Sequence, residues 1–556
     1  MNAEIPKIQT AVQLVGPDRL KINNSKTVEE PGPYQILAEV EAVGLCFSDL
    51  KLLKQFSNHV RKSNIVSGID ESVLKAIPSY VHGDAPTVPG HETVVRIAKV
   101  GSQVEGIKPG QRFLVQTDYR WLPTADSNAA FGYNFEGALQ QYVLMDQRVI
   151  TSPEGQSMLI PAADDLSASA IALVEPWACV EDAYAVKERT FLKNDGQMLI
   201  VADDRFDEKV FVGFLEKYGT PCQITILSEK NQLSEIGVCV KYITELADLP
   251  EVSFDDIVYF GSNPKTVEGL FSKVAASGLF NIVLCGGRFG RAILSQVGRV
   301  HYGNIRIIGT VGNNPAEAMD HIPKTAEIRA GDKINVIGAA GPMGIMHVVR
   351  NLSQGIEGVK VYGGDLDDER LKRLKVIAAP VVQKNNVDFV SYNPVKNKID
   401  ELFDYTVIMA PIPKRVASSV VNSAKSGIIN IFAGIPATVN AEIELDSYIE
   451  KQLYFVGTSG STLEDMETVL RKVEAGLLDT NISVGAICGL KGAIEGIRAV
   501  ENQKITGKII VYPACEELDL IELENLKKNM PEIFNSLNDG LWNKAAEDNL
   551  LTAKGT

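Results

Sequence analysis

The sequence predicts an α/β fold in which a mostly-β lobe is followed by two consecutive α/β domains of common design. Residues 10–150 contain short apolar runs separated by Gly and Pro, as in TVEEPGPYQILAEVEAVGLC, which is typical of strands and turns. A helical stretch, ASAIALVEPWACVEDAYAVKE, begins at Ala168. Beyond it strands and helices alternate, which predicts parallel sheets covered by helices.

A long internal repeat defines the two α/β domains. FDDIVYFGSNPK, which starts at Phe254, recurs as FDYTVIMAPIPK from Phe403, an offset of 149 positions (403 − 254). SGLFNI recurs as SGIINI at the same offset. This period matches a whole nucleotide-binding domain and exceeds that of a solenoid unit. We therefore predict domain A at 193–327 and domain B at 328–478, with unrelated α/β units of similar texture as the alternative.

Length and charge restrict the classes of partner. At 556 residues the chain is long enough for about three or four domains. Its 55 Lys and Arg against 70 Asp and Glu give a net charge of −15, so neither nucleic acid nor a membrane surface is expected as a partner. No apolar run approaches the roughly 18 residues of a membrane span, and MNAEIPKIQT lacks the features of a secretory signal. Seven scattered cysteines indicate reduced thiols and therefore a cytoplasmic protein.

Domain B contains a glycine-rich turn between a predicted strand and a predicted helix, INVIGAAGPMGIMHVVRNL. Gly338 suits the tight turn, Gly341 the close approach of a pyrophosphate, and Gly344 the close packing of helix on sheet. Asp365, at the end of the next strand, is placed to accept hydrogen bonds from a ribose 2′-hydroxyl and would repel a 2′-phosphate, which favours NAD over NADP. The alternative role for Asp365 is to cap the following helix.

Domain A lacks these glycines. Aligning the two domain openings places Asp203, Phe206 and Lys209 where domain B has its three glycines. Asp203 and the adjacent Asp204 are carboxylates that can cap the free N–H groups of the helix and would repel a pyrophosphate. Domain A is therefore predicted to keep the architecture without the cofactor site.

Three separated segments of the N-terminal lobe hold metal-ligand types: AVGLCFSDLK with Cys46, PTVPGHETVV with His91, and ALVEPWACVEDA with Glu175. A thiolate, an imidazole and a carboxylate would form a catalytic zinc site with one open position. The alternatives are that Cys46 is a small buried hydrophobe and that Glu175 only shapes the start of a helix.

In this order the motifs resemble those of the zinc-dependent medium-chain dehydrogenase/reductase superfamily of alcohol and polyol dehydrogenases. The matching patterns are G-x-C-x-S-D, P-G-H-E, V-G-x-x-V-x-x-x-x-P-G from Val100, and E-P-x-A-C. The closing AIEGIRAVENQKITGKIIVYP resembles the return of the family's chain to its catalytic domain. GAAGPMG followed by MHV is similar to the sorbose-phosphate reductase branch, and a glutamate at 175 is similar to the polyol dehydrogenases.

The resemblance implies a fold of four parts. Residues 1–190 would be a GroES-like catalytic domain, completed by residues 479–513. Residues 193–327 would be a degenerate Rossmann-like domain A and residues 328–478 the NAD-binding Rossmann domain B. Residues 514–556 would form a helical tail that packs on its own chain or, alternatively, contacts another copy.

The resemblance also implies residue roles. One catalytic zinc ion would be held by Cys46, His91 and Glu175, with Glu92 as a near or exchanging fourth ligand. Asp49 would orient His91, and Ser48 would pass the substrate proton. The family's four clustered cysteines are absent, so no structural zinc is expected. The NAD-binding residues would be Gly338, Gly341, Pro342, Met343, Gly344, Asp365 and Arg370.

The implied activity is hydride transfer between NAD and a secondary alcohol or ketone on a polyol, sugar or sugar derivative, with or without a phosphate. One rival is a zinc-free reductase of the same superfamily, and another is a non-catalytic nucleotide-binding scaffold. A polar insertion, QFSNHVRKSNIVSGIDESVLKAIPSY, either covers the active site or is inert surface.

Domain A raises the question of assembly. Dimers of this family typically join their nucleotide-binding domains through the last strand. We therefore expect NIRIIGTVG of domain A to pack against QLYFVGTSG of domain B, so that one chain imitates a dimer. A homo-oligomer is the other expectation.

Overall fold

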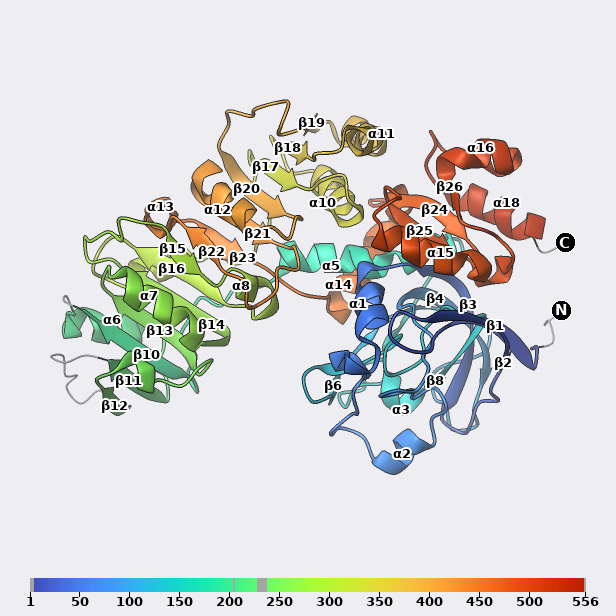
Figure 1. Cartoon of the computed structure of the whole chain (residues 1–556), viewed down its shortest axis with the longest axis horizontal. Helices are drawn as coiled ribbons and strands as arrows, with labels where there is room; N and C mark the ends of the chain where they lie inside the picture. Colours follow the sequence, from blue (N-terminus) through green and yellow to red (C-terminus); the bar gives the residue numbers. More distant parts are fainter. Residues whose placement is uncertain (1–4, 204–205, 228–237, 555–556) are drawn as a thin grey trace. The chain divides into compact units, whose positions relative to one another are not determined.

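The computed structural model describes residues 5–203, 206–227 and 238–554. The chain divides into two compact units, which we call unit 1 (residues 1–178 and 461–556) and unit 2 (residues 179–460). Figure 1 shows that the blue N-terminal and red C-terminal parts of the chain belong to the same unit. The predicted fold class, a mostly-β lobe with two parallel α/β sheets, is confirmed.

Unit 1 is built on an eight-stranded sheet with the order β26-β24-β25-β3-β4-β5-β9, in which β8 also pairs with β3. Its strands are β3 (Gln35–Gly44), β4 (Glu92–Val100), β5 (Arg112–Val115), β8 (Tyr142–Asp146), β9 (Leu159–Pro161), β24 (Val484–Cys488), β25 (Lys508–Val511) and β26 (Ile521–Glu522). Two further pairs are β1 (Ile8–Leu14) with β2 (Leu20–Thr27) and β6 (Asp118–Pro123) with β7 (Asn128–Ala130). Ile510 of β25 lies opposite Gly44 of β3, so the C-terminal part of the chain extends the N-terminal sheet.

The helices of unit 1 are α1 (Phe47–Gln55), α2 (Glu71–Lys75), α3 (Gln147–Ile150), α4 (Ala168–Ala172), α14 (Leu463–Glu474), α15 (Leu490–Glu501), α16 (Leu526–Asn529), α17 (Pro531–Phe534) and α18 (Lys544–Lys554). Helix α5 (Val174–Ala185) runs from unit 1 into unit 2. The helices of the tail pack on their own chain. Glu547 of α18 is buried and accepts hydrogen bonds from Ala168 N, Ser169 N and the hydroxyl of Tyr512.

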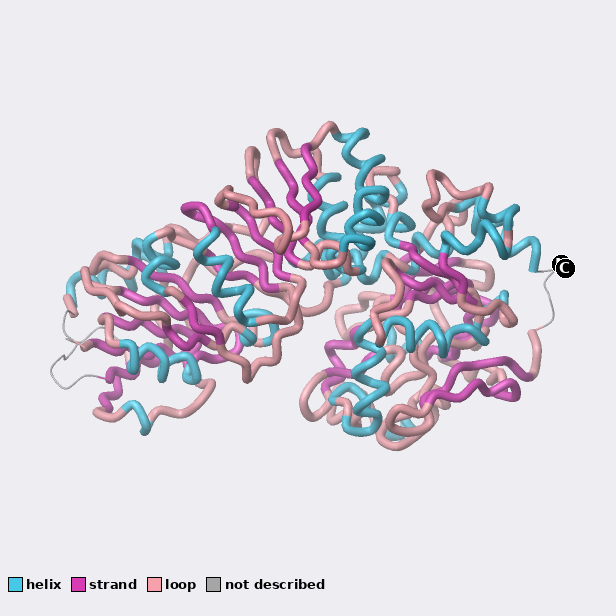
Figure 2. The backbone as a smooth tube through the Cα atoms, turned by 45° about the horizontal axis from the view of Figure 1, so that its top comes forward, coloured by secondary structure: helices cyan, strands magenta, loops and turns pink. Residues whose placement is uncertain are grey.

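Unit 2 contains two six-stranded parallel sheets with the same strand order, β12-β11-β10-β13-β14-β16 in domain A and β19-β18-β17-β20-β21-β23 in domain B. Figure 2 shows these strands in magenta with the cyan helices beside them. The bounds in domain A are β10 (Gln197–Ala202), α6 (Glu208–Tyr218), β11 (Gln223–Leu227), β12 (Cys239–Ile243), β13 (Phe254–Phe260), α7 (Pro264–Leu270), β14 (Val274–Val283), β15 (Ile293–Ser295), α8 (Gly298–Tyr302), β16 (Arg306–Thr310) and α9 (Ala316–Met319). Those in domain B are β17 (Lys333–Ile337), α10 (Pro342–Ser353), β18 (Lys360–Gly364), α11 (Asp368–Asn385), β19 (Asp388–Tyr392), β20 (Phe403–Ile408), α12 (Pro413–Asn422), β21 (Ser423–Ile431), β22 (Ala441–Ile443), α13 (Leu445–Glu450) and β23 (Tyr454–Val456).

The repeat extends to irregular features of the backbone. Ser277 and Ser426, 149 positions apart (426 − 277), both adopt a left-handed backbone, with φ of 57° and 59°. Such a conformation is uncommon for a residue that is not glycine. Each domain also has a register shift in the strand pair that contains this serine. The shift lies between Phe254 and Asp256 in the β13–β14 pair of domain A and between Phe403 and Tyr405 in the β20–β21 pair of domain B. Two unrelated domains would not be expected to share both irregularities.

Domains A and B share one hydrophobic core and pair through short edge strands. β15 pairs antiparallel with β22, and Leu294 lies opposite Glu442, 148 positions further along the chain (442 − 294). The hydroxyl of Tyr448 donates to the carbonyl of Ile307 at 2.7 Å, which ties α13 of domain B to β16 of domain A.

The contacts between the two domains are reciprocal. The Cα of Gly309 faces the side chain of Ile449, and the Cα of Gly457 faces His301. Gly457 is 148 positions after Gly309, and Ile449 is 148 positions after His301, so each contact maps onto the other (457 − 309 and 449 − 301). Reciprocity of this kind characterises an interface with two-fold symmetry.

None of the helices in the three described ranges combines the length and the apolar character that crossing a bilayer requires.

Candidate metal and cofactor sites

The segment that holds Cys46 folds as the junction between a strand and a helix. β3 ends at Gly44, and Cys46 is the N-cap residue of α1. Asp49, at the third position of the helix, accepts a hydrogen bond from the backbone N–H of Cys46 at 3.0 Å. This is a capping-box arrangement, which fixes the direction in which the helix leaves the sheet. Local sequence therefore sets the position of the thiol.

The imidazole of His91 is held from both of its nitrogens. Its Nδ1 lies 3.1 Å from Oδ1 of Asp49, and its Nε2 lies 3.1 Å from Oγ of Ser48. The same Ser48 hydroxyl lies 3.0 Å from Sγ of Cys46. Burial opposes the protonated form of His91, but Tyr133, Asp49 and Cys46 raise its pKa well above the ordinary value. Asp49 thus lies where an orienting residue would lie, and Nε2 faces the thiol.

Glu92 is fully buried and is held by one oxygen only. Lys508 of β25 donates to its Oε1 at 2.5 Å, and Oε2 is a buried oxygen without a hydrogen-bond partner among the described residues. Gly44 makes room for this carboxylate, because a Cβ there would meet Oε2 at 2.1 Å. Burial disfavours the charged form of Lys508, but Glu92 and Cys46 raise its pKa. A buried carboxylate oxygen without a partner is costly unless a cation completes it.

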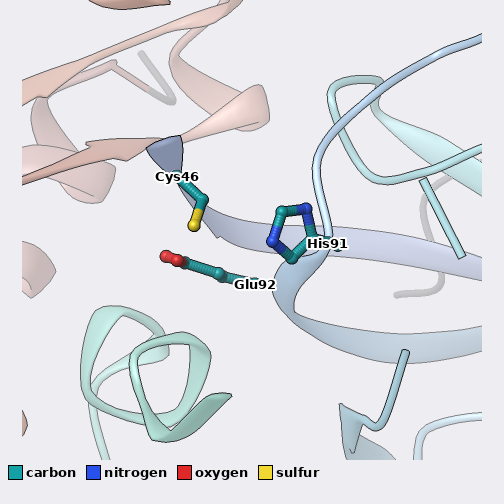
Figure 3. Close-up of side chains that lie close together, drawn as sticks. All are labelled: Cys46, His91 and Glu92. Carbon is teal, nitrogen blue, oxygen red and sulfur yellow. The ribbon is translucent and has the colours of Figure 1, made fainter. Parts of the chain in front are cut away.

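Cys46, His91 and Glu92 form a group that could hold a metal ion, which we call the metal-binding group. One ligand atom from each lies within 4.8 Å of the others, and no other group of three or more His, Cys, Asp or Glu residues meets this criterion within residues 5–203, 206–227 and 238–554. Figure 3 shows the thiol, the imidazole and the carboxylate converging. A thiolate, a neutral imidazole and a carboxylate are ligands that zinc accepts, so the residues present fit a zinc ion.

Glu175 lies outside this three-residue group, although the sequence predicts it as a primary ligand and Glu92 as the secondary one. It is buried in the first turn of α5. Burial raises the pKa of Glu175 to about 7. The charge of His91 lowers this pKa, and the charge of Glu92 raises it. Glu175 therefore neighbours the group electrostatically, and its role as a ligand stays a prediction.

The glycine-rich turn of domain B has the geometry of a phosphate-binding loop. Gly338 follows β17 with a φ of 84°, and Gly341 is the N-cap of α10. A Cβ on Gly344 would meet the carbonyl oxygen of Gly338 at 2.2 Å, so the helix packs tightly against the turn. A Cβ on Gly341 would meet only that oxygen, at 3.8 Å. Because Pro342 has no N–H, the amides of Met343 and the residue after it are the donors available at the helix start.

The carboxylate of Asp365 links this turn to the next helix. It accepts hydrogen bonds from Ala340 N and from Asp367 N, both at 3.1 Å. The N-cap of α11 is Asp367, so the capping role considered for Asp365 belongs to its neighbour. Each carboxylate oxygen has a second lone pair, so Asp365 retains capacity for a ribose hydroxyl.

A cavity of about 350 Å³ opens beside the turn, lined among others by Gly338, Asp365, Tyr392 and Arg415. Its place at the carboxyl ends of parallel strands is where nucleotides bind in such sheets. Arg370, a predicted cofactor residue, is not among its lining residues and lies on the first turn of α11. Arg415 is a lining residue of this cavity, and it was not predicted from the sequence.

Domain A does cap its helix with a carboxylate, but not with the predicted one. Asp207 is the N-cap of α6 and accepts hydrogen bonds from the backbone N–H groups of Lys209 and Val210. The side chain of Asp203 instead accepts the hydroxyl hydrogen of Tyr259. Asp204 lies outside the described residues.

Phe206, which the sequence alignment sets against the middle glycine, packs its ring edge-on against Phe260, with 5.3 Å between ring centres. The helix starts pair Gly341, the N-cap of α10, with Asp207, the N-cap of α6, so a carboxylate lies in domain A where domain B has a glycine. This is the opposite of what a pyrophosphate requires.

Three residues near the metal-binding group were not predicted: Lys508, Tyr133 and Arg61. Lys508 lies in a segment that the family resemblance had flagged as returning to the catalytic domain, but its partner is 416 positions away. Tyr133 lies in AAFGYNFEG, whose Gly-flanked aromatics are the only local signal. Arg61 belongs to the polar insertion, which offered no motif.

Comparison with known proteins gives a family match for the N-terminal part of the chain and several similar proteins. Residues 32–154 match the family described as "Alcohol dehydrogenase GroES-like domain". The chain is 25% identical over 248 residues to "Uncharacterized protein YggP" of Escherichia coli (strain K12), covering 41% of this chain and 58% of that protein. It is 22% identical over 246 residues to "Mannitol-1-phosphate 5-dehydrogenase" of Aliivibrio fischeri, covering 40% and 57%. The chain therefore spans less than two thirds of either relative.

A solved structure with a similar fold is 2R,3R-butanediol dehydrogenase from Bacillus subtilis. The TM-score is 0.52 at 15% sequence identity, and the match covers 91% of this chain and 99% of the other. At this identity the likeness concerns the fold alone.

Proposed function

Because residues 32–154 belong to the alcohol dehydrogenase GroES-like family and the chain has the fold of the medium-chain dehydrogenases, we propose that it is a zinc- and NAD-dependent oxidoreductase. It would interconvert a secondary alcohol and a ketone on a polyol, sugar or sugar derivative. The observation that carries the proposal is the convergence of Cys46, His91 and Glu92 around a buried carboxylate oxygen that lacks a partner.

The protein's own residues would prepare the site in three ways. Asp49 accepts from Nδ1 of His91 and so leaves Nε2 as the ligand nitrogen. Lys508 anchors one oxygen of Glu92 and leaves the other for the metal. When bound, zinc would supply Lewis-acid polarisation of the substrate oxygen. Ser48, within hydrogen-bond distance of both Cys46 and His91, is the group placed to receive the hydroxyl proton.

Domain B would hold the nicotinamide cofactor, with the pyrophosphate at the start of α10 and the ribose near Asp365. The contrast between the domains supports this division of labour. At the start of α10 domain B has Gly341 with open space beside it, whereas at the start of α6 domain A has the carboxylate of Asp207. We infer that one cofactor binds per chain, and that NAD is preferred because the carboxylate of Asp365 would repel a 2′-phosphate.

A reduction screen tests the function. Purified protein is expected to reduce NAD with at least one compound from a panel of secondary alcohols, polyols, sugars and sugar phosphates, and NADP less well. Treatment with a chelator should abolish the activity, and added zinc should restore it, because the Lewis acid lowers the activation barrier by several kcal/mol. Full activity after complete metal removal would favour the zinc-free reductase, and absence of NAD binding would favour the scaffold.

We further propose that domain A serves domain B as a built-in partner, so that one chain contains a pseudo-dimer of nucleotide-binding domains. The support is the reciprocity of their contacts, in which Gly309 faces Ile449 and Gly457 faces His301. The register of β15 and β22, which sets Leu294 opposite its own repeat counterpart Glu442, places a local two-fold axis at this pair.

Symmetry of the interface predicts equal effects at equivalent positions. Gly309→Ala and Gly457→Ala should each destabilise the protein by about 1–3 kcal/mol, because each added methyl overpacks a contact with the other domain. Gly213→Ala in α6 is the control, since a Cβ there meets nothing within 4 Å and alanine favours the helix by about 1 kcal/mol. Urea unfolding midpoints would measure all three. An effect at only one of the two interface glycines would contradict the pseudo-dimer.

The cytoplasm is the compartment we propose, since scattered cysteines at positions without a disulfide pattern suit reduced thiols.

A further inference from the structure

The polar insertion after α1 is fastened to the body of unit 1. Lys62 is fully buried, and its ammonium group donates to the carbonyls of Val81 and Ala85, the latter at 2.8 Å. The hydroxyl of Thr124 donates to the carbonyl of Val60 at 3.0 Å. Side chains next to these anchors are therefore held in fixed positions.

Arg61 lies between these anchors in sequence and contacts two residues outside the insertion. Its guanidinium forms a two-point ion pair with Asp118, in which Nη2 lies 3.3 Å from Oδ2. The same guanidinium lies 5.5 Å from the ring centre of Tyr133. The ring of Tyr133 in turn lies 5.7 Å from that of His91. One aromatic ring thus separates the ion pair from a predicted zinc ligand.

Arg61 interacts electrostatically with Glu175 as well as with Asp118. Burial disfavours the charged form of Arg61, but Asp118, Tyr133 and Glu175 keep its pKa above the ordinary value. Burial raises the pKa of Tyr133, and a hydrogen bond with Ser48 is among the effects that oppose the rise. Tyr133 therefore contacts the residue that we propose receives the substrate proton.

The pair remains accessible to a small molecule. The side chain of Arg61 is 27% exposed and that of Asp118 is 11% exposed. Asp118, but not Arg61, lines a hollow of about 510 Å³ together with Gln116 and Arg120. Arginine has five N–H donors, of which the contact with Asp118 uses two, and each carboxylate oxygen has a second lone pair. The pair thus offers both a donor and an acceptor at fixed positions.

We propose that Arg61 and Asp118 determine substrate specificity by binding a hydroxyl group next to the reacting carbon. This inference rests on the proposed function and adds to it the residues that recognise a second hydroxyl group of the substrate. Because Asp118 neutralises Arg61, the pair suits an uncharged hydroxyl and not a phosphate, which the carboxylate of Asp118 would repel. A site built to hydrogen-bond a hydroxyl discriminates strongly against an analogue that lacks it, since its polar groups are then left unpaired.

The test compares sorbitol, sorbitol 6-phosphate and 2-butanol as substrates of the full chain. Arg61→Gln and Asp118→Asn should each raise KM for sorbitol and for its phosphate ester by a similar factor, about 10- to 100-fold. KM and kcat for 2-butanol should change less than about threefold, because this alcohol has no neighbouring hydroxyl. Zinc content and NAD affinity should stay unchanged. Arg148→Gln, which breaks the ion pair with Asp146 elsewhere in unit 1, is the matched control and should leave all three substrates unaffected.

The outcomes separate this inference from the proposed function. Variants that impair 2-butanol and sorbitol equally would show a merely structural role and overturn the inference. An effect of Arg61→Gln on the phosphate ester alone would also overturn the inference, since Arg61 would then bind the phosphate group and not a hydroxyl. If wild-type protein with one zinc ion per chain oxidises neither these three alcohols nor any other compound of the reduction screen, the proposed function fails and the inference falls with it.

Discussion

Cys46→Ser is expected to remove the metal and to lower kcat by about 10³-fold or more. Serine is close to cysteine in size, so the junction between β3 and α1 should persist, but a hydroxyl is a much weaker zinc ligand than a thiolate. The Lewis acid supplies several kcal/mol of transition-state stabilisation, and every 1.36 kcal/mol corresponds to about a factor of ten in rate. Elemental analysis and steady-state kinetics on the same preparation would measure both effects.

The control for this substitution is Cys222→Ser. Cys222 is an exposed cysteine of domain A, far in sequence from the metal-binding residues, and its replacement should leave zinc content and kcat unchanged. A Cys46→Ser protein with one zinc ion per chain and wild-type kcat would show that Cys46 is not a ligand.

Gly341→Asp is expected to weaken NAD binding about 100-fold, which corresponds to about 2.7 kcal/mol. A Cβ at this position meets only the carbonyl oxygen of Gly338, at 3.8 Å, so the fold should tolerate the new side chain. The added carboxylate would lie at the start of α10 and compete with the pyrophosphate for the free N–H groups. Calorimetric titration with NAD would give the affinity, and the melting temperature would verify the fold.

Gly213→Asp is the matched substitution in domain A. Gly213 lies in α6, the helix that corresponds to α10, and a Cβ there meets nothing within 4 Å. It should leave the affinity for NAD unchanged. If Gly213→Asp weakened NAD binding as much as Gly341→Asp does, the assignment of the cofactor to domain B would be wrong.

Features that depend on neighbouring residues along the chain were predictable from sequence. The strand, glycine turn and helix of domain B follow from short-range patterns, and the structure places Gly338, Gly341 and Gly344 accordingly. The capping contact between Asp49 and Cys46 spans three positions and belongs to the same class. The repeat was predictable because the same sequence pattern occurs twice at a nearly constant offset.

Features that depend on contacts between distant segments were not predictable. Nothing near Glu92 indicates that Lys508 would hold one of its oxygens and leave the other for a metal. The sequence analysis therefore ranked Glu175 above Glu92 as a ligand, whereas the structure brings Glu92 together with Cys46 and His91. The capping of α6 by Asp207 and not by Asp203 depends on the tyrosine hydroxyl at position 259, which reaches Asp203 from the neighbouring strand.

The insertion illustrates the same limit. Its sequence is polar and has no periodicity, and a surface loop fits that composition as well as an active-site segment does. The burial of Lys62 and the pairing of Arg61 with Asp118, across 57 positions, show that the segment is anchored, and both are tertiary contacts.

The most direct test of the central claim is an anomalous difference map, recorded at the zinc absorption edge, from crystals of the purified full-length protein. We predict one strong peak per chain, within coordination distance of Sγ of Cys46, Nε2 of His91 and the unpaired oxygen of Glu92. A peak at another location, or none near these atoms in zinc-replete crystals, would contradict the account.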